Sequence, residues 1–389
     1  MGKCVCEHAN DCSAKPIDKN ANLVYVFKII LVFYKPEVCM IGERIKRARA
    51  AAGLSMQALG EQVGISANMV KKYEHDQSMP SSGVLLKLAT ALSVRTEYFF
   101  RPAQVTLGEM EYRKKASASA KLLKKIESDV VDQAERWLSL KNVWPNFPIA
   151  SFNYQPDVHA VSTLDAVEQV ATKVRTDWQL GMNPLPDLID LLESKGILVI
   201  VSNVPQADKF DGLQAKISGQ PIVVVSSHWP GCRQRFTLAH ELGHLVLHGL
   251  LDESIDEEMA CNRFASAFLL PEVGLFQHLG ERRSNVDPKE LYFLKHEYGL
   301  SMAACLYRSA DLGVITEEKK RQIFIQFSKN GWRKQEPGNP YPQEQTLLFE
   351  QLVYRALAEG IVSESKAAEL LQMSVMALHK QRQMLTEAV

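Results

Sequence analysis

The feature that most constrains this chain is a His-Glu-x-x-His pattern within the segment RQRFTLAHELGHLVLHG. Apolar residues surround the pattern on nearly all sides, which predicts a buried helix. One helical turn separates His240 from His244, so both imidazoles leave the same face and can bind one metal ion. Glu241 lies beside them as a candidate general base. The sequence therefore predicts a domain organised around a buried, metal-binding helix.

A metal ion held by two histidines needs a third protein ligand. His248 continues the helix, but its Cα lies about 12 Å along the axis from that of His240, so three imidazoles cannot converge on one ion. The acidic residues that follow are Asp252, Glu253, Asp256, Glu257 and Glu258. Glu257 fits a helix-capping box, whereas Glu258 shares a helical face with Asn262. We expect Glu258 to be the third ligand, with Cys261 a weaker candidate.

An α+β domain is predicted around this helix, over residues 161–330. The apolar runs ILVIVSNV and PIVVVSS predict strands, and helical patterns precede them. The segment after Asp211 fits either an edge strand that pairs with an extended substrate or an ordinary hairpin. Arg233 and Arg235, just before the motif, fit structural ion pairs or stabilisation of a tetrahedral intermediate, and the structural role is favoured.

A separate helical module is predicted over residues 40–101. IGERIKRARAAAGL reads as a basic amphipathic helix that ends at Gly53, and Ser55 and Ser66 cap two short helices joined by a turn at Gly64. Two short helices in this arrangement predict a helix-turn-helix. Between residues 41 and 101 there are nine Lys and Arg against five Asp and Glu, a net charge of +4 that favours nucleic acid.

The exposed start of the second short helix is expected to meet DNA. The candidates for base contacts are Gln57, Ser66, Asn68, Met69 and Lys72. The candidates for phosphate contacts are Arg44, Arg47 and Lys71. The alternative is a small helical bundle that binds protein, with its basic residues merely solvated.

The rest of the chain is less informative. Residues 1–39 are predicted to be a poorly ordered extension or a misassigned start, and residues 102–160 a helical connector that packs on a neighbouring domain or pairs in a homodimer. Residues 331–389 are predicted to form a linker and a degenerate helix-turn-helix. No run of 18 apolar residues occurs, so no membrane span is expected. Four of the seven cysteines lie within the first 39 residues and the other three are scattered, which fits a cytoplasmic protein better than a disulfide scaffold.

The N-terminal module resembles the Xre family of phage-repressor-like DNA-binding domains. The matching residues are Ala58, Leu59, Gly64, Ile65, Ser66, Val70, Tyr73, Glu74, Pro80, Leu88 and Ala89. This resemblance implies binding to double-stranded operator DNA.

The second domain resembles the ImmA/IrrE family of zinc-dependent endopeptidases. The matching residues are His240, Glu241, His244, Glu258, Asn262, Phe264, Ala265, Leu269, Leu270 and Pro271. Cys261 departs from the family, in which alanine is commoner. The resemblance implies a gluzincin-like protease in which His240, His244 and Glu258 hold Zn²⁺ and Glu241 is catalytic. It also implies that the substrate is a repressor or antitoxin-type protein.

Together these observations predict a mainly α, multidomain protein. It would combine an N-terminal all-α helix-turn-helix bundle, a central α+β zincin-like metallopeptidase domain and a C-terminal helical region. The expected function is a bacterial, DNA-binding zinc endopeptidase that regulates transcription by cleaving a repressor or antitoxin. The alternative is a regulator or antitoxin whose zincin domain senses a metal or binds a toxin without cleaving anything.

Overall fold

The computed structural model describes residues 41–101, 120–158, 160–203, 210, 212–217 and 219–383. The extension predicted over residues 1–39 lies outside this part of the chain. The described residues form sixteen α-helices and one three-stranded sheet, so the fold is mainly α, as the sequence predicts. No helix in these ranges is long and apolar enough to cross a membrane.

The N-terminal module is a bundle of short helices. They are α2 (Ile41–Ala51), α3 (Met56–Val63), α4 (Ala67–Glu74), α5 (Ser82–Ala91) and the 3₁₀ helix η1 (Thr96–Phe100). The side chains of Ser55 and Ser66 accept backbone N–H bonds and start α3 and α4, as expected for caps. Gly64 ends α3 in the left-handed conformation that a non-glycine residue avoids. Ile45, Leu59 and other apolar side chains fill a core of the bundle's own.

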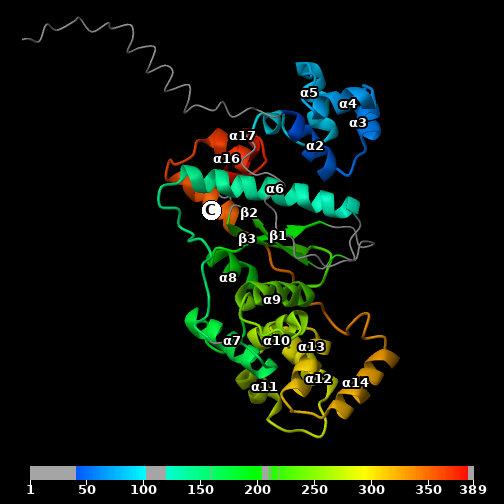
Figure 1. Ribbon diagram of the computed structural model, residues 1–389, viewed down its shortest axis with the longest axis vertical. Coiled ribbons are helices and arrows are strands. Elements are labelled where there is room, and N and C mark those ends of the chain that lie inside the picture. The colour runs from blue at the N-terminus through cyan, green and yellow to red at the C-terminus, as the bar shows by residue number, and fades with distance from the viewer. Residues whose placement is uncertain are drawn as a thin grey trace, which may run out of the picture.

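A small sheet occupies the centre of the second part of the molecule (Figure 1). Its strands are β1 (Leu198–Ser202), β2 (Gly212–Ile217) and β3 (Gln220–Ser226), in the order β1-β3-β2. β3 pairs in parallel with β1 and antiparallel with β2, so β2 is an edge strand of the sheet as described. The segment after Asp211 therefore forms a hairpin with β3 whose outer strand lies at an edge of the sheet, and the pairing of this edge with a substrate stays a prediction. Asp211 itself is outside the described residues.

Alternate residues of the strands enter two different cores, because successive side chains leave opposite faces of a sheet. Val199, Val223 and Val225 point into a core shared with the helix that carries the His-Glu-x-x-His pattern. Ile200 and Val224 point into a core on the other face.

Helix α6 (Ala120–Val143) covers the second face together with the C-terminal helices. These are α15 (Leu348–Ala358), α16 (Glu364–Leu370) and α17 (Val375–Gln383). Buried side chains such as Ile126, Leu352 and Leu370 share one core with the sheet. The boundaries predicted at residues 160 and 330 therefore do not separate independent cores. The connector and the C-terminal region complete the sheet domain because its second apolar face needs a cover.

The first face of the sheet carries the remaining helices (Figure 1). They are α7 (Leu164–Asp177), α8 (Leu188–Ser194), α9 (Gly231–Leu247), α10 (Glu257–Leu269), α11 (Glu272–Leu279), α12 (Pro288–Tyr298), α13 (Met302–Asp311) and α14 (Glu317–Lys329). Helix α9 lies next to the sheet, and α10 packs along α9. This packing places the His-Glu-x-x-His segment at the centre of the largest core.

Candidate metal centre and nucleic-acid interface

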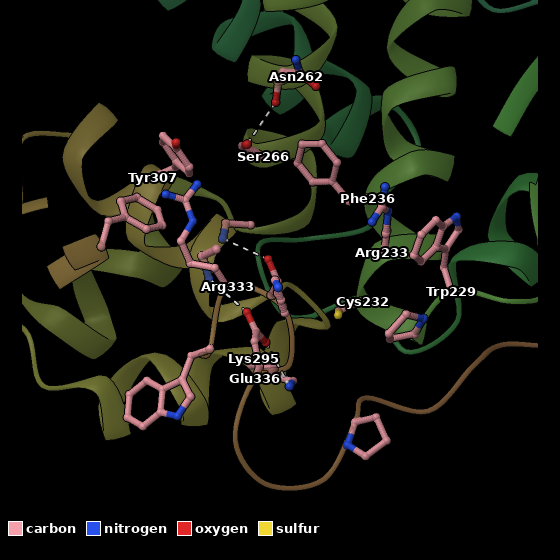
Figure 2. Close-up of a pocket in the computed structure, with 18 of the residues that line it drawn as sticks. Trp229, Cys232, Arg233, Phe236, Asn262, Ser266, Lys295, Tyr307, Arg333 and Glu336 are labelled. Atoms are coloured by element: carbon pink, nitrogen blue, oxygen red, sulfur yellow. Dashed lines mark hydrogen bonds and ion pairs between the residues drawn. The ribbon is translucent and has the colours of Figure 1, made fainter. Parts of the chain in front are cut away.

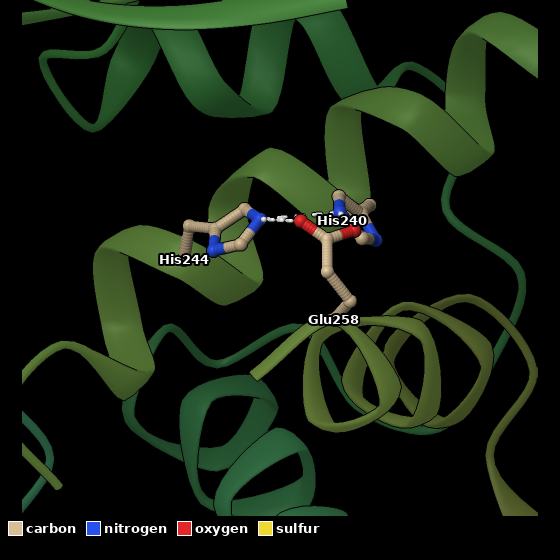
Figure 3. Close-up of side chains that lie close together, drawn as sticks. All are labelled: His240, His244 and Glu258. Carbon is tan, nitrogen blue, oxygen red and sulfur yellow. Dashed lines mark hydrogen bonds and ion pairs between the residues drawn. The ribbon is translucent and has the colours of Figure 1, made fainter. Parts of the chain in front are cut away.

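The two halves of α9 have different surroundings. Its first half lines a cavity of about 1000 Å³, together with α10, α13 and residues 332–340 (Figure 2). Its second half carries the motif (Figure 3). The helix begins at Gly231, where a Cβ would lie 1.9 Å from the carbonyl oxygen of Pro342, so only glycine fits between the helix and this returning segment.

The structure brings His240, His244 and Glu258 together, as the spacing predicts (Figure 3). The two Nε2 atoms lie 3.2 Å apart. The Glu258 carboxylate lies 3.4 Å from Nε2 of His240 and 3.5 Å from Nε2 of His244. Both histidines are buried, whereas the Glu258 side chain is 52% exposed. The cluster therefore has an open side, which a catalytic metal site requires for substrate.

This donor set fits a tetrahedral Zn²⁺ ion. Zinc–ligand bonds of 2.0–2.1 Å place neighbouring ligand atoms about 3.3–3.4 Å apart in a tetrahedron. The two Nε2 atoms lie 3.2 Å apart, and each approaches a different oxygen of Glu258: Oε2 lies 3.4 Å from His240 and Oε1 lies 3.5 Å from His244. Two imidazoles and one carboxylate fill three positions and leave the fourth for a reacting group.

The other ring nitrogen of each histidine is held by a neighbour on α10. Nδ1 of His240 donates to Oδ1 of Asn262 at 3.0 Å, and Nδ1 of His244 donates to Oε1 of Glu257 at 3.0 Å. A proton on Nδ1 leaves the lone pair on Nε2, so both rings are set in the tautomer and orientation that bind a metal.

The predicted capping role of Glu257 is wrong. The cap of α10 is Asp256, whose side chain accepts from the backbone N–H of Met259 at 2.8 Å. Helix α10 starts two residues later than a cap at Ser254 would require, and the side chain of Glu257 contacts His244. Sequence reasoning also missed the role of Asn262, although its place one turn after Glu258 was a usable signal.

Gly243 explains how α10 comes close enough to supply Glu258. A Cβ at this position would lie 3.2 Å from Cδ1 of Phe264 and 3.3 Å from Cα of Cys261. These separations are shorter than ordinary van der Waals contact, so the glycine permits the close approach of the two helices. Cys261 is fully buried in this contact and is not part of the metal-ligand cluster.

Other residues near the motif have structural roles. Arg235 is buried and pairs with Glu344, and it also donates to the carbonyl of Leu185 at 2.8 Å. Arg233 stacks over the ring of Trp229 at 3.6 Å. The structure therefore supports the structural ion pair that is favoured for Arg235. Glu241 is buried beside His240 on α9.

The helix-turn-helix presents most of its predicted DNA-facing residues to solvent. Those fully exposed are Gln57, Ser66, Asn68, Lys71 and Lys72. Met69 is half-buried and packs against the core of the bundle. Helix α2 packs against α6, and α3 and α4 lie on the side of the bundle away from it (Figure 1). The surface expected to read DNA is open.

The prediction that Arg44 and Arg47 contact phosphates is wrong for this arrangement. Their exposed fractions are 2% and 4%. Both guanidinium groups donate to the carboxylate of Glu135 on α6, at 2.5 and 2.9 Å. Beside them, burial raises the pKa of Tyr98 to about 12. Arg44 and Arg47 of α2 thus form a domain contact, which local sequence patterns do not indicate because Glu135 lies 91 residues from Arg44.

Two family models match this chain. A helix-turn-helix model matches residues 45–99, and a model of a peptidase family, the IrrE N-terminal-like domain, matches residues 192–310. The SPbeta prophage-derived uncharacterized HTH-type transcriptional regulator YonR of Bacillus subtilis is 34% identical over 73 residues, which cover 18% of this chain and 68% of that protein. The chain belongs to the helix-turn-helix transcriptional regulators. It also carries an IrrE-like domain, which contains the whole metal-ligand cluster.

Other similar regulators match the same N-terminal module. The HTH-type transcriptional regulator ImmR of Bacillus subtilis is 33% identical over 66 residues, which cover 17% of this chain and 52% of that protein. The uncharacterized HTH-type transcriptional regulator y4aM of Sinorhizobium fredii is 37% identical over 60 residues, covering 15% of this chain and 42% of that protein. The chain thus spans about half the length of these two relatives.

Proposed function

We propose that this protein is a DNA-binding, zinc-dependent endopeptidase that controls transcription by cleaving a repressor or antitoxin-type partner. The observation that carries the proposal is the cluster of His240, His244 and Glu258, whose candidate ligand atoms all lie within 4.8 Å of one another. The helix-turn-helix would hold the enzyme at operator DNA, close to proteins bound there.

The residues around the cluster fit peptide hydrolysis. A zinc ion, when bound, supplies Lewis acidity that makes water a nucleophile at neutral pH and polarises a peptide carbonyl. Asn262 and Glu257 hold the two ligand imidazoles in place. Glu241 takes a proton from the attacking water and gives it to the leaving amine as the C–N bond breaks. Glu241 is not among the three candidate ligands. Metal binding alone would therefore not require a carboxylate at this position, whereas catalysis requires one as the general base.

The sheet supports a polypeptide as the substrate. β2 is an edge strand and packs beside α9. An extended peptide can add to such an edge through main-chain hydrogen bonds. A zincin fold that binds a partner without cleaving it would use the same edge, so the two functions differ only in the chemistry at Glu241.

The Glu241→Gln variant separates these functions. It preserves size and hydrogen bonding but removes the base, so zinc content should stay at about one ion per chain and cleavage should fall about 10²–10⁴-fold. The assay captures the partner by pulldown, incubates it with the wild type and with Glu241→Gln, and identifies fragments by mass spectrometry. If Glu241→Gln regulates its operon in cells as well as the wild type does, proteolysis is not the function and the binding role is correct.

A further inference from the structure

The cavity beside α9 lies next to the candidate metal centre. Phe236 lies one turn before His240 on α9, and Asn262 lies one turn after Glu258 on α10. Both line the cavity, and Asn262 bonds to His240 directly. Ser266 extends the α10 wall by another turn and donates to the backbone carbonyl of Asn262 at 3.0 Å (Figure 2). The cavity thus runs along both helices and is separated from the candidate ligand His240 by the side chain of Asn262.

The far wall of the cavity is rich in aromatic rings. Tyr307 of α13 packs against Phe324 of α14, with ring centroids 4.9 Å apart, and Trp332 also lines the cavity. The Tyr307 side chain is 47% exposed although it is large and mostly apolar. Rings that face an open cavity of about 1000 Å³ suit a bulky apolar occupant.

The lining carries a surplus of positive charge. Its two carboxylates are both in ion pairs: Asp311 with Arg263 at 3.1 Å, and Glu336 with Lys295 at 3.0 Å. Arg233, Arg333 and Lys334 add three exposed basic groups to the same lining. This charge favours an occupant that carries carboxylates.

We propose that this cavity is the specificity groove for the polypeptide substrate and takes a bulky apolar side chain flanked by acidic residues. The inference rests on the proposed peptidase function and names the class of segment that would be cut. The apolar side chain would lie between Phe236 and the rings of Tyr307 and Phe324. Its acidic neighbours would face Arg333 and Lys334.

A binding assay tests the groove without any cleavage. Full-length Glu241→Gln protein is titrated against three fluorescein-labelled peptides, and fluorescence anisotropy is recorded. The first peptide has two phenylalanines flanked by aspartates, the second replaces the aspartates by lysines, and the third replaces the phenylalanines by glycines. The first peptide should bind about tenfold or more tightly than either of the others, because it satisfies both the apolar wall and the charge.

Substitutions of residues that line the cavity test whether the peptide binds there. The double variant Arg333→Glu/Lys334→Glu should weaken binding of the acidic peptide about tenfold or more, whereas Arg321→Glu/Lys329→Glu, at exposed positions of α14 outside the lining, should leave it unchanged. Ala304→Trp, which fills the cavity, should also weaken binding, and circular dichroism checks that it is folded. Equal binding of all three peptides, or equal effects of the two double variants, would overturn the proposal.

Two further outcomes distinguish this inference from the proposed function. If the first peptide binds selectively but the wild type cleaves no peptide, the specificity groove is supported and the proposed peptidase function is wrong. If the wild type cleaves peptides without preference for apolar segments flanked by acidic residues, the peptidase function is supported and the specificity groove is wrong. If anilinonaphthalene sulfonate binds and Ala304→Trp blocks it, while no peptide binds, the cavity holds a small aromatic anion and the proposal is wrong.

Discussion

Arg44 donates to Glu135 at 2.5 Å across the boundary between the helix-turn-helix module and helix α6, and both side chains are buried. Arg47 donates to the other carboxylate oxygen at 2.9 Å. Arg95 and Arg101 extend the contact by donating to the backbone carbonyls of Met373 and Glu369 near the C-terminus. The helix-turn-helix module is thus fixed to the domain that carries the candidate metal ligands.

The first prediction concerns this contact. Glu135→Ala should loosen the helix-turn-helix module, because it leaves two buried guanidinium groups without their shared carboxylate, a loss of about 3–5 kcal/mol for a broken buried pair. Hydrogen exchange in α2 should become faster. Glu127→Ala, on the same helix but without a contact to Arg44, is the matched control. Unchanged exchange in the Glu135 variant would show that the pair does not hold the module.

A second prediction separates DNA contacts from domain contacts. Lys71→Ala should reduce the salt dependence of DNA binding by about one unit of slope, because it removes a phosphate contact. Arg47→Ala should lower the melting temperature and leave the slope unchanged. Fluorescence anisotropy with operator-length duplexes at several salt concentrations measures the slope. A smaller slope in Arg47→Ala would mean that α2 leaves α6 when DNA binds.

The third prediction concerns metal affinity. Glu258→Ala should lower zinc content below one ion per chain, because it removes the anionic ligand of the cluster. Asn262→Ala and Glu257→Ala should retain zinc but with about 10–100-fold weaker affinity, since they hold the ligands rather than bind the ion. Competition with a chelating dye measures the affinity, and the exposed Glu253→Ala is the control. Full zinc occupancy in a His240→Ala/His244→Ala variant would refute the site.

The fourth prediction is a dependence of stability on pH. Burial raises the pKa of Glu193 to about 8, above the ordinary value of 4.5 that it has in the unfolded chain. Between these values the folded protein retains a proton that the unfolded chain releases, so the free energy of unfolding should decrease as pH rises from about 4.5 to about 8. Glu193→Gln should remove much of this slope, whereas the exposed Glu281→Gln should not. Urea unfolding at several pH values tests this, and equal slopes in the two variants would exclude Glu193 as the cause.

The sequence by itself determined the local features of this protein. The caps at Ser55 and Ser66 and the strands around Val199 and Val223 follow from turn chemistry and apolar patterning, which act over a few residues. The pairing of His240 with His244 could also be predicted, because helical periodicity places residues four apart on one face, whereas the approach of Glu258 depends on the packing of α10 against α9.

Only the tertiary structure decided which long-range partners these residues meet. The role of Glu135 as the partner of Arg44 could not be read from the sequence, because basic residues on a helix look the same whether they meet a phosphate or a carboxylate. The sequence also does not predict that α6, the sheet and α15–α17 share one core. An apolar face shows that a helix or strand must be covered, but the burial of nonpolar surface is non-directional and does not specify which distant segment covers it.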